Sequence, residues 1–260
     1  LASVSKGGRL VMARNCHKSV FNALTLGDIE PVYAYPSEIE EYGISGAVEA
    51  DEVKCLLAEN PDAEAVILPS PNYYGICSDI EAISRVVHEA GKILIVDQAH
   101  GAHLKFFGKY GIGSMPPAAE DCGADIVVNS THKTLLSFTQ SAVLNVVSDS
   151  VDLLRLEDRL QAVESTSPSY ILMASLDINA DIMSDHCREI TAAWETAIEL
   201  FYEKAPEIRG LKVMTVPGHM DRTKLNIDMS GAGLTGAELE ELLMGYGIFS
   251  ELTTGNILMC

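Results

Sequence analysis

One acid and one amine follow two successive apolar runs of this chain. The run at residues 93–96 ends in Asp97, and the run at residues 126–128 opens into Ser130-Thr131-His132-Lys133. Because ligands of an α/β sheet bind outside the carboxyl ends of its strands, both groups are expected at the same edge. A carboxylate facing a pyridinium nitrogen and a lysine forming a Schiff base are the two groups that pyridoxal phosphate requires of a protein. The spacing therefore predicts a site for that cofactor.

Simpler explanations exist for each of these residues. Asp97 at a strand end can cap the next helix or bind a metal, and Lys133 in a strand–loop turn can be a plain surface lysine. A Schiff-base lysine needs a partly desolvated, polar-lined site in which the pKa of its amine can fall. Ser130 and His132 flank the lysine with a hydroxyl and an imidazole, and both groups suit a phosphate ester.

Three further histidines lie close to this acid in the sequence or at the same predicted edge. His17 follows the first predicted strand, where it can either stack on an aromatic cofactor or serve as a core or capping histidine. His100 and His103 are three residues apart, with Gly101 between them. The helical HExxH zinc motif needs a spacing of four and a glutamate, so no metal site is expected.

Two loops carry other candidate groups. The segment Pro69-Ser-Pro-Asn-Tyr-Tyr-Gly75 follows a predicted strand and can border a pocket, although turn chemistry explains it as well. The segment Ser165-Thr-Ser-Pro-Ser-Tyr170 precedes a predicted helix. Its hydroxyls can contact an anion or cap the helix, with Pro168 in the first helical position, and we favour capping.

The elements that must position these residues alternate between strands and helices. Apolar runs predict strands at residues 10–13, 32–35, 65–69, 93–97, 125–129 and 142–147, and helical periodicity fills the gaps. One helix is expected to be capped by Asp79 and to end at Gly91. Such alternation predicts an α/β fold with a doubly wound, mainly parallel sheet.

The pattern changes beyond residue 167. A long helical stretch, broken at least once, is expected to run towards Glu203, with Pro206 closing it. Strands are predicted at residues 211–216, 225–229 and 248–260, with a capping box at Thr235-Gly-Ala-Glu238 between the last two. We therefore expect a major cofactor-binding domain at residues 1–183, and a linking helix with the start of a smaller α/β domain at residues 184–260. The chain stops inside an expected strand, as a fragment would.

Composition narrows the possible partners. The 260 residues are 47% hydrophobic and 21% charged, as in ordinary globular proteins, and the net charge of −19 disfavours binding to nucleic acid or anionic membranes. No apolar run approaches the roughly 18 residues of a transmembrane helix, and no signal peptide is evident. The six cysteines show no CxxC spacing, so we expect reduced thiols and a cytoplasmic protein.

Taken together, five ordered motifs resemble the Orn/Lys/Arg decarboxylase family of pyridoxal-phosphate enzymes, which have the aspartate-aminotransferase type of fold (fold type I). The motifs are Arg14-Asn-Cys-His-Lys-Ser19, Pro71-Asn-Tyr-Tyr-Gly75, Val96-Asp-Gln-Ala-His-Gly-Ala-His103, Ser130-Thr-His-Lys-Thr134 and Thr166-Ser-Pro-Ser-Tyr170.

Several site assignments follow from the resemblance. It implies Lys133 as the Schiff-base lysine, Asp97 as the partner of the ring nitrogen, and His17 stacked on the ring. It also implies that Ser130 and His132 lie at or near the phosphate, that His100 binds the cofactor, and that Thr166 reaches the site of a neighbouring subunit in a homodimer or larger homo-oligomer.

Three departures from the family pattern accompany these matches. Gln98 stands where the family usually has glutamate, and Asn129 stands where glutamine is common. Family members also carry a phosphate-binding loop, rich in glycine and hydroxyl groups, just before the residues that match Leu1-Ala-Ser3.

The resemblance implies a carbon–carbon lyase that decarboxylates a basic amino acid (lysine, arginine or ornithine) to an amine of the polyamine pathway. One alternative is another reaction of the same cofactor, an aminotransferase or aldolase reaction. A second alternative is a non-catalytic homologue that acts as a regulatory partner in an oligomer. A nicotinamide dehydrogenase is a weaker possibility, because Gly7-Gly8 is not followed by a GxGxxG turn.

Overall fold

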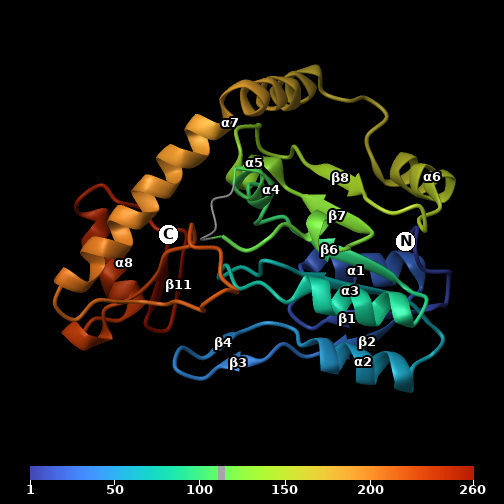
Figure 1. The fold of residues 1–260 in the computed structure, drawn as a ribbon, viewed down its shortest axis with the longest axis horizontal. Coiled ribbons are helices and arrows are strands. Elements are labelled where there is room, and N and C mark those ends of the chain that lie inside the picture. Colours follow the sequence, from blue (N-terminus) through green and yellow to red (C-terminus); the bar gives the residue numbers. More distant parts are fainter. Residues whose placement is uncertain (111–114) are drawn as a thin grey trace.

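Two β-sheets organise the chain, whose computed structural model describes residues 1–110 and 115–260 (Figure 1). The larger sheet has six strands, in the order β2 (Glu30–Ala34), β1 (Arg9–Ala13), β5 (Ala63–Pro69), β6 (Ile93–Asp97), β7 (Ile126–Asn129) and β8 (Val143–Val146). The first five strands are parallel, and β8 runs antiparallel to β7. The expected mainly parallel α/β sheet is confirmed, with each predicted strand displaced by at most two residues at either end.

Helices follow most of these strands. They are α1 (Lys18–Gly27), α2 (Ala50–Glu59), α3 (Ile80–Glu89), α4 (Leu104–Lys109), α5 (Thr131–Thr134) and α6 (Leu153–Val163), with a short 3-10 turn at Ala119–Asp121. In α3, Ile83 and Val87 are fully buried in the main core, and the Asp79 carboxylate accepts from the amide of Ala82. Gly91, with φ of +68°, follows the last turn. The cap and stop predicted for this helix are therefore confirmed.

The strand order predicts a ligand-binding crevice at the carboxyl edge of the large sheet. β1 lies between β2 and β5, so the order of connection reverses at β1. In doubly wound sheets, ligands bind at such a switch point, outside the carboxyl ends of the strands. The segments that follow β1, β5, β6 and β7 all begin at this edge, and they carry four of the five motifs, those up to Thr134.

A smaller antiparallel sheet, at the left of Figure 1, forms the C-terminal part. Its order is β11 (Leu252–Thr254), β12 (Ile257–Met259), β10 (Asn226–Asp228) and β9 (Lys212–Val213). Helix α8 (Gly236–Met244) begins with the predicted capping box, in which Thr235 and Glu238 bond reciprocally. The strand expected at residues 248–260 is instead the β11–β12 hairpin. A separate two-stranded ribbon pairs β3 (Glu38–Ile39) with β4 (Ile44–Ser45).

The long helix α7 (Tyr170–Lys204) is unbroken over 35 residues, so the expected interruption is wrong. Its N-cap is Ser169, which confirms capping, but Pro168 precedes the cap instead of filling the first helical position. Two buried polar residues inside it bond outward: Ser175 Oγ accepts from the Phe138 amide, and Asn179 Oδ1 accepts from the Leu136 amide. These polar positions hold the loop after α5 and do not break the helix.

The boundary predicted between residues 183 and 184 falls inside α7, so the two expected domains would share that helix. Pro206 lies in a 3-10 turn, Ala205–Glu207, directly after α7, as predicted for the end of the helical stretch. No helix in the described part of the chain is long and apolar enough to cross a membrane.

Candidate active site

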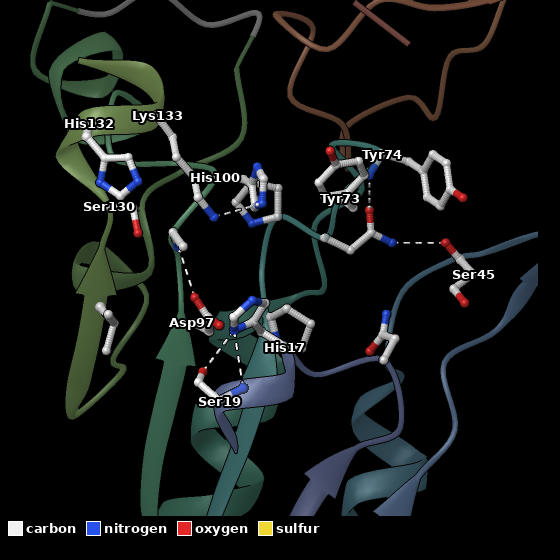
Figure 2. Close-up of a pocket in the computed structure, with 16 residues that line it drawn as sticks. His17, Ser19, Ser45, Tyr73, Tyr74, Asp97, His100, Ser130, His132 and Lys133 are labelled. Atoms are coloured by element: carbon white, nitrogen blue, oxygen red, sulfur yellow. Dashed lines mark hydrogen bonds between the residues drawn. The ribbon is translucent and has the colours of Figure 1, made fainter. Parts of the chain in front are cut away.

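A cavity of about 600 Å³ lies at the carboxyl ends of β1, β5, β6 and β7. Figure 2 shows that its walls come from the segments that follow these four strands, with the β4 ribbon at one side. Six of the seven residues predicted for the site line it: His17, Asp97, His100, Ser130, His132 and Lys133. The topology has therefore gathered groups that are more than a hundred residues apart in the sequence.

The amine of Lys133 points at the ring of His100, and its Nζ lies 3.2 Å from His100 Nε2 (Figure 2). Partial burial lowers the pKa of Lys133; Lys224 adds to this lowering, while the carboxylates of Asp97 and Glu251 oppose it. Burial, and then the charges of Lys133 and Lys224, lower the pKa of His100 to about 4. His100 is therefore neutral near pH 7 and can accept a hydrogen bond from the lysine.

Asp97 ends β6 on the floor of the cavity, close to His17 (Figure 2). Its Oδ1 accepts from the amide of Ala99 at 3.1 Å, which fixes the carboxylate at the strand end. His17 caps α1, since its Nδ1 accepts from the amide of Ser19. His17 is therefore the capping histidine that the sequence allowed, and it also lines the cavity, while its stacking on a cofactor ring stays a prediction.

Further polar atoms lie along two other walls of the cavity. Ser130 begins α5 without using its hydroxyl as a cap. The Nδ1–H of His132 donates to the carbonyl of Ser141 at 2.7 Å, which orients the ring. The side-chain oxygen of Asn15 is buried without a hydrogen-bond partner among the described residues. An unsatisfied polar atom beside a cavity is a group that a bound ligand can satisfy.

The loop of Tyr73 and Tyr74 lines the opposite wall, as the sequence allowed. The ring of Tyr73 meets that of His100 edge-on, with centroids 5.0 Å apart, and its hydroxyl donates to Glu251 at 2.8 Å. Burial and then this carboxylate raise the pKa of Tyr73 to about 12. Tyr74 in turn contacts Thr254 through its hydroxyl, at 3.3 Å.

The C-terminal residues at this wall were not predicted from the sequence. Glu251 and Thr254 belong to the segment read as a plain strand, and Lys224 lies in a turn between two strands. Their link to the site depends on groups that lie more than 90 residues earlier in the sequence. A local pattern holds no signal for such contacts.

His103 does not line the cavity. It is buried beside Asp221, with 3.1 Å between His103 Nε2 and Asp221 Oδ2. Its ring also packs against Trp194 of α7, with centroids 5.0 Å apart. Within residues 1–110 and 115–260, no group of three histidine, cysteine or acidic side chains is placed to hold a metal ion.

Thr166 is not brought to this cavity by the chain's own fold. It lies exposed in the connection between α6 and α7, the segment at the upper right of Figure 1, and it does not line the cavity. A contact between Thr166 and the site of another subunit stays a prediction.

Behind the cavity, the two departures Gln98 and Asn129 meet around one carboxylate. Gln98 Nε2 donates to Glu120 Oε2 at 2.9 Å, and the amides of Asn129 and Asn145 donate to Glu120 Oε1 at 2.7 and 3.0 Å. Gln98 Oε1 also accepts from the Ala119 amide. Where the family usually has glutamate, Gln98 therefore supplies an amide group that can donate a hydrogen bond to the carboxylate of Glu120.

Restoring the acid, as Gln98→Glu, is expected to lower the free energy of unfolding by about 1.5–3 kcal/mol at pH 7, because a donor to a charged group is lost. Two facing carboxylates also repel, which raises the pKa of one of them in the folded state. The deficit should therefore shrink as the pH falls towards 5. Urea denaturation at both pH values measures it. The double variant Gln98→Glu/Glu120→Gln should recover most of the loss, and an unchanged deficit in the double variant would contradict this account.

Comparison with known proteins gives one family. The family model described as "Orn/Lys/Arg decarboxylase, major domain" matches residues 1–205. An arginine decarboxylase of Bacillus subtilis (strain 168) is 32% identical over all of this chain, which covers 54% of that protein. The lysine decarboxylase LdcA of Pseudomonas aeruginosa is 27% identical over 69% of this chain and 26% of its own length.

Solved structures agree on the fold. The lysine decarboxylase LdcF of Francisella novicida superposes with a TM-score of 0.80 at 22% identity, over all of this chain and 43% of that one. The chain thus spans about half the length of the arginine decarboxylase that it matches, and less than half of the solved enzyme.

Proposed function

The chain belongs to the Orn/Lys/Arg decarboxylase family, and on that premise we propose that the protein decarboxylates a basic amino acid with pyridoxal 5′-phosphate. One observation carries the proposal: Asp97 and Lys133 line the same cavity, outside the ends of neighbouring parallel strands. A carboxylate and a lysine of lowered pKa are the pair that this cofactor demands.

The residues present fit that cofactor. Lys133 would hold it through its amine, Asp97 would pair with its ring nitrogen, and His17 would lie against its ring. Ser130 and His132 would contact its phosphate. The unsatisfied oxygen of Asn15 adds a polar atom that a ligand in the cavity could satisfy.

The chemistry divides between the cofactor and the chain. When bound, pyridoxal phosphate withdraws electrons from the α-carbon of the amino acid, so that CO₂ can leave. Asp97 supports this by keeping a negative charge beside the ring. Lys133 Nζ, beside the neutral Nε2 of His100, would carry the proton that replaces the carboxylate on the α-carbon. The Tyr73 ring, packed on His100, covers this pair on the side of the aromatic loop.

Arginine is the substrate that we propose among the basic amino acids, and the product would be the corresponding amine of the polyamine pathway. The arginine decarboxylase of B. subtilis aligns over this whole chain, whereas the lysine decarboxylase of P. aeruginosa aligns over 69% of it at lower identity. The carboxylate of Glu251, hydrogen-bonded to Tyr73, is an acidic group near Lys133 that suits a cationic substrate.

We also propose a homodimer or larger homo-oligomer in a reducing compartment, the cytoplasm. Large apolar side chains are exposed on the loop after Lys133 and along the first turns of α7: Leu136, Phe138, Tyr170, Ile171, Met173 and Ile178. An apolar face of this kind marks a protein interface. It would bring a second subunit beside the cavity. All six cysteines are free, as in reducing compartments. Light scattering of the full-length protein measures the oligomer.

The direct test is CO₂ release by the full-length protein, loaded with the cofactor, from arginine, lysine and ornithine in parallel. We expect release from arginine at the highest kcat/KM. Release of CO₂ from none of the three, with the cofactor still bound, would instead favour another reaction of the same cofactor or a regulatory role. Comparable rates with lysine would keep the decarboxylase and overturn the choice of arginine.

A further inference from the structure

A second cavity, of about 310 Å³, adjoins the active-site cavity. Asn15 and Ser45 line both cavities, so the two spaces meet at these residues. Figure 2 shows Ser45 across the active-site cavity from Ser130 and His132, the residues proposed to contact the phosphate. The second cavity therefore lies at the wall opposite those contacts. Its volume falls within the range of roughly 300–1,000 Å³ that small-molecule sites occupy.

The β3–β4 ribbon forms one wall of the second cavity and is firmly anchored. Ile44 of β4 is 3% exposed and belongs to a core cluster with Met214 and Met220 of the C-terminal part. Asn72, in the aromatic loop, donates from Nδ2 to the carbonyl of Ser45 at 2.9 Å. The ribbon is thus held both by the C-terminal part and by the loop that borders the active site.

Arg14 lines this cavity and carries a charge that lacks an acidic partner. It follows β1, and its guanidinium carbon lies 5.4 Å from the ring centroids of both Phe21 and Tyr33. Within the described part of the chain, its side chain forms no ion pair. Aromatic rings orient a guanidinium without neutralising it. The charge of Arg14 therefore stays available to a carboxylate in the cavity, which a guanidinium can bind through two parallel hydrogen bonds.

Glu38 brings the opposite charge to the same cavity. It begins β3 and lies directly opposite Ser45 in the antiparallel ribbon. Such residues have Cβ atoms about 4.5–5.5 Å apart on one face, so Glu38 stands beside the residue that both cavities share. No basic side chain among the described residues pairs with Glu38, whereas Glu41 in the same ribbon pairs with Lys212. The carboxylate of Glu38 is thus available to a cationic group.

The lining as a whole suits a ligand that carries both charges. Arg14 and Glu38 form no ion pair with each other in the described structure. Asn15 Oδ1 is buried without a partner and can accept a hydrogen bond from an N–H group. The ring of Tyr35, 63% exposed, offers a face on which a guanidinium can stack. A basic amino acid supplies all of these groups, since it has a carboxylate, an ammonium group and a second cation at its far end.

We propose that the second cavity binds the intact amino-acid substrate before it reaches Lys133, with Arg14 on its carboxylate and Glu38 on a cationic group. Arg14 would then separate substrate from product, because the amine formed by decarboxylation has lost the group that Arg14 binds. This role deepens the proposed function and rests on it for the identity of the amino acid. It involves binding only and can be measured without turnover.

The test is calorimetric titration of the full-length protein with L-arginine and with agmatine, the amine that arginine yields on losing CO₂. Prior treatment with pyridoxal phosphate and borohydride fixes any cofactor on Lys133 and stops turnover. The native protein should bind arginine about tenfold more tightly than agmatine, as expected for one charge-assisted contact. Arg14→Gln should remove this difference by weakening arginine alone. Glu38→Gln should weaken both ligands.

Two matched variants control for the change of charge. Lys18→Gln removes a positive charge at the first residue of α1, and Glu40→Gln removes a negative charge from the exposed turn of the ribbon. Both residues lie outside the two cavities, so both variants should bind arginine as the native protein does. Equal affinities of the native protein for arginine and agmatine would overturn the inference. An equal loss for both ligands in Arg14→Gln would also overturn it.

The outcome is separate from that of the proposed reaction. A protein that takes up no cofactor passes unchanged through the borohydride step, and the same titration applies to it. A preference for arginine that is lost in Arg14→Gln, in a protein that releases no CO₂, would retain the second cavity and reject the decarboxylase. CO₂ release together with equal binding of arginine and agmatine would do the reverse.

Discussion

Replacing Lys133 with alanine is expected to lower kcat for decarboxylation by roughly 10³-fold or more, the scale of loss when a covalent catalytic group is removed. Lys133 combines two roles in the proposed mechanism, since it would hold the cofactor and stand beside the α-carbon as proton carrier. Its neighbour His100 cannot take over the first role, because an imidazole has no primary amine. CO₂ release by the full-length protein, with saturating cofactor, measures the effect.

Borohydride reduction of the same samples separates the two roles. The native protein mixed with pyridoxal phosphate should yield one labelled peptide, carrying Lys133, and Lys133→Ala should yield none. Lys6→Ala, at an exposed position, is the matched control and should retain both label and activity. Label spread over surface lysines in the native protein, or normal turnover by Lys133→Ala, would reject the assignment of this lysine.

His103→Leu is expected to lower the free energy of unfolding by about 3–5 kcal/mol, because it leaves the charge of Asp221 buried without its partner. The chain supplies a matched control in His186, whose Nδ1 lies 3.5 Å from Glu189 Oε2 with both side chains more than 60% exposed. His186→Leu should cost less than 1 kcal/mol, because solvent screens that pair. Urea denaturation gives both values, and equal losses would contradict the role given to burial.

The contribution of Asp221 to the free energy of unfolding should change with pH in opposite directions in the native protein and in His103→Leu. Burial raises the pKa of Asp221, but the neighbouring His103 and the Thr223 hydrogen bonds outweigh it, so the pKa lies below its usual value. In the native protein this contribution is therefore present above about pH 4 and lost as the pH falls further. In His103→Leu, burial dominates, so protonation of Asp221 removes a buried charge that has lost its partner. The loss in free energy of unfolding, relative to the native protein, should therefore become smaller as the pH falls. Adding Asp221→Asn should recover much of the loss at pH 7.

The strands at the centre of the sheet could be predicted from the sequence because strands that are buried on both faces consist almost entirely of apolar residues. Val66, Leu94 and Val127 are all at most 2% exposed, so their strands read as continuous apolar runs. The polar residues directly after those runs then had to share one edge. That inference placed Asp97 and Lys133 together, and the structure does the same.

Residues whose partners are remote in the sequence could not be predicted in this way. Asn179 is a polar residue that disfavours a helix when judged by sequence alone, and only the structure shows that it accepts a hydrogen bond from the loop after Lys133. His103, three residues from His100, invited a metal reading, although its partner is an acid 118 positions later. Position 98 could be compared with the family, but the acid that explains its amide, Glu120, is revealed by the contact itself.

The two hydrogen bonds of the aromatic loop imply an order of assembly during synthesis. Tyr73 and Tyr74 bond to residues 178 and 180 positions later. At roughly 5–20 residues per second, a ribosome needs about 10–35 s to deliver those partners after the tyrosines have been made. The large sheet can pair in that interval, since β8 ends at Val146. A nascent chain would therefore have made every residue that lines the pocket, Asp97 and Lys133 included, before the partners that hold Tyr73 and Tyr74 in place emerge.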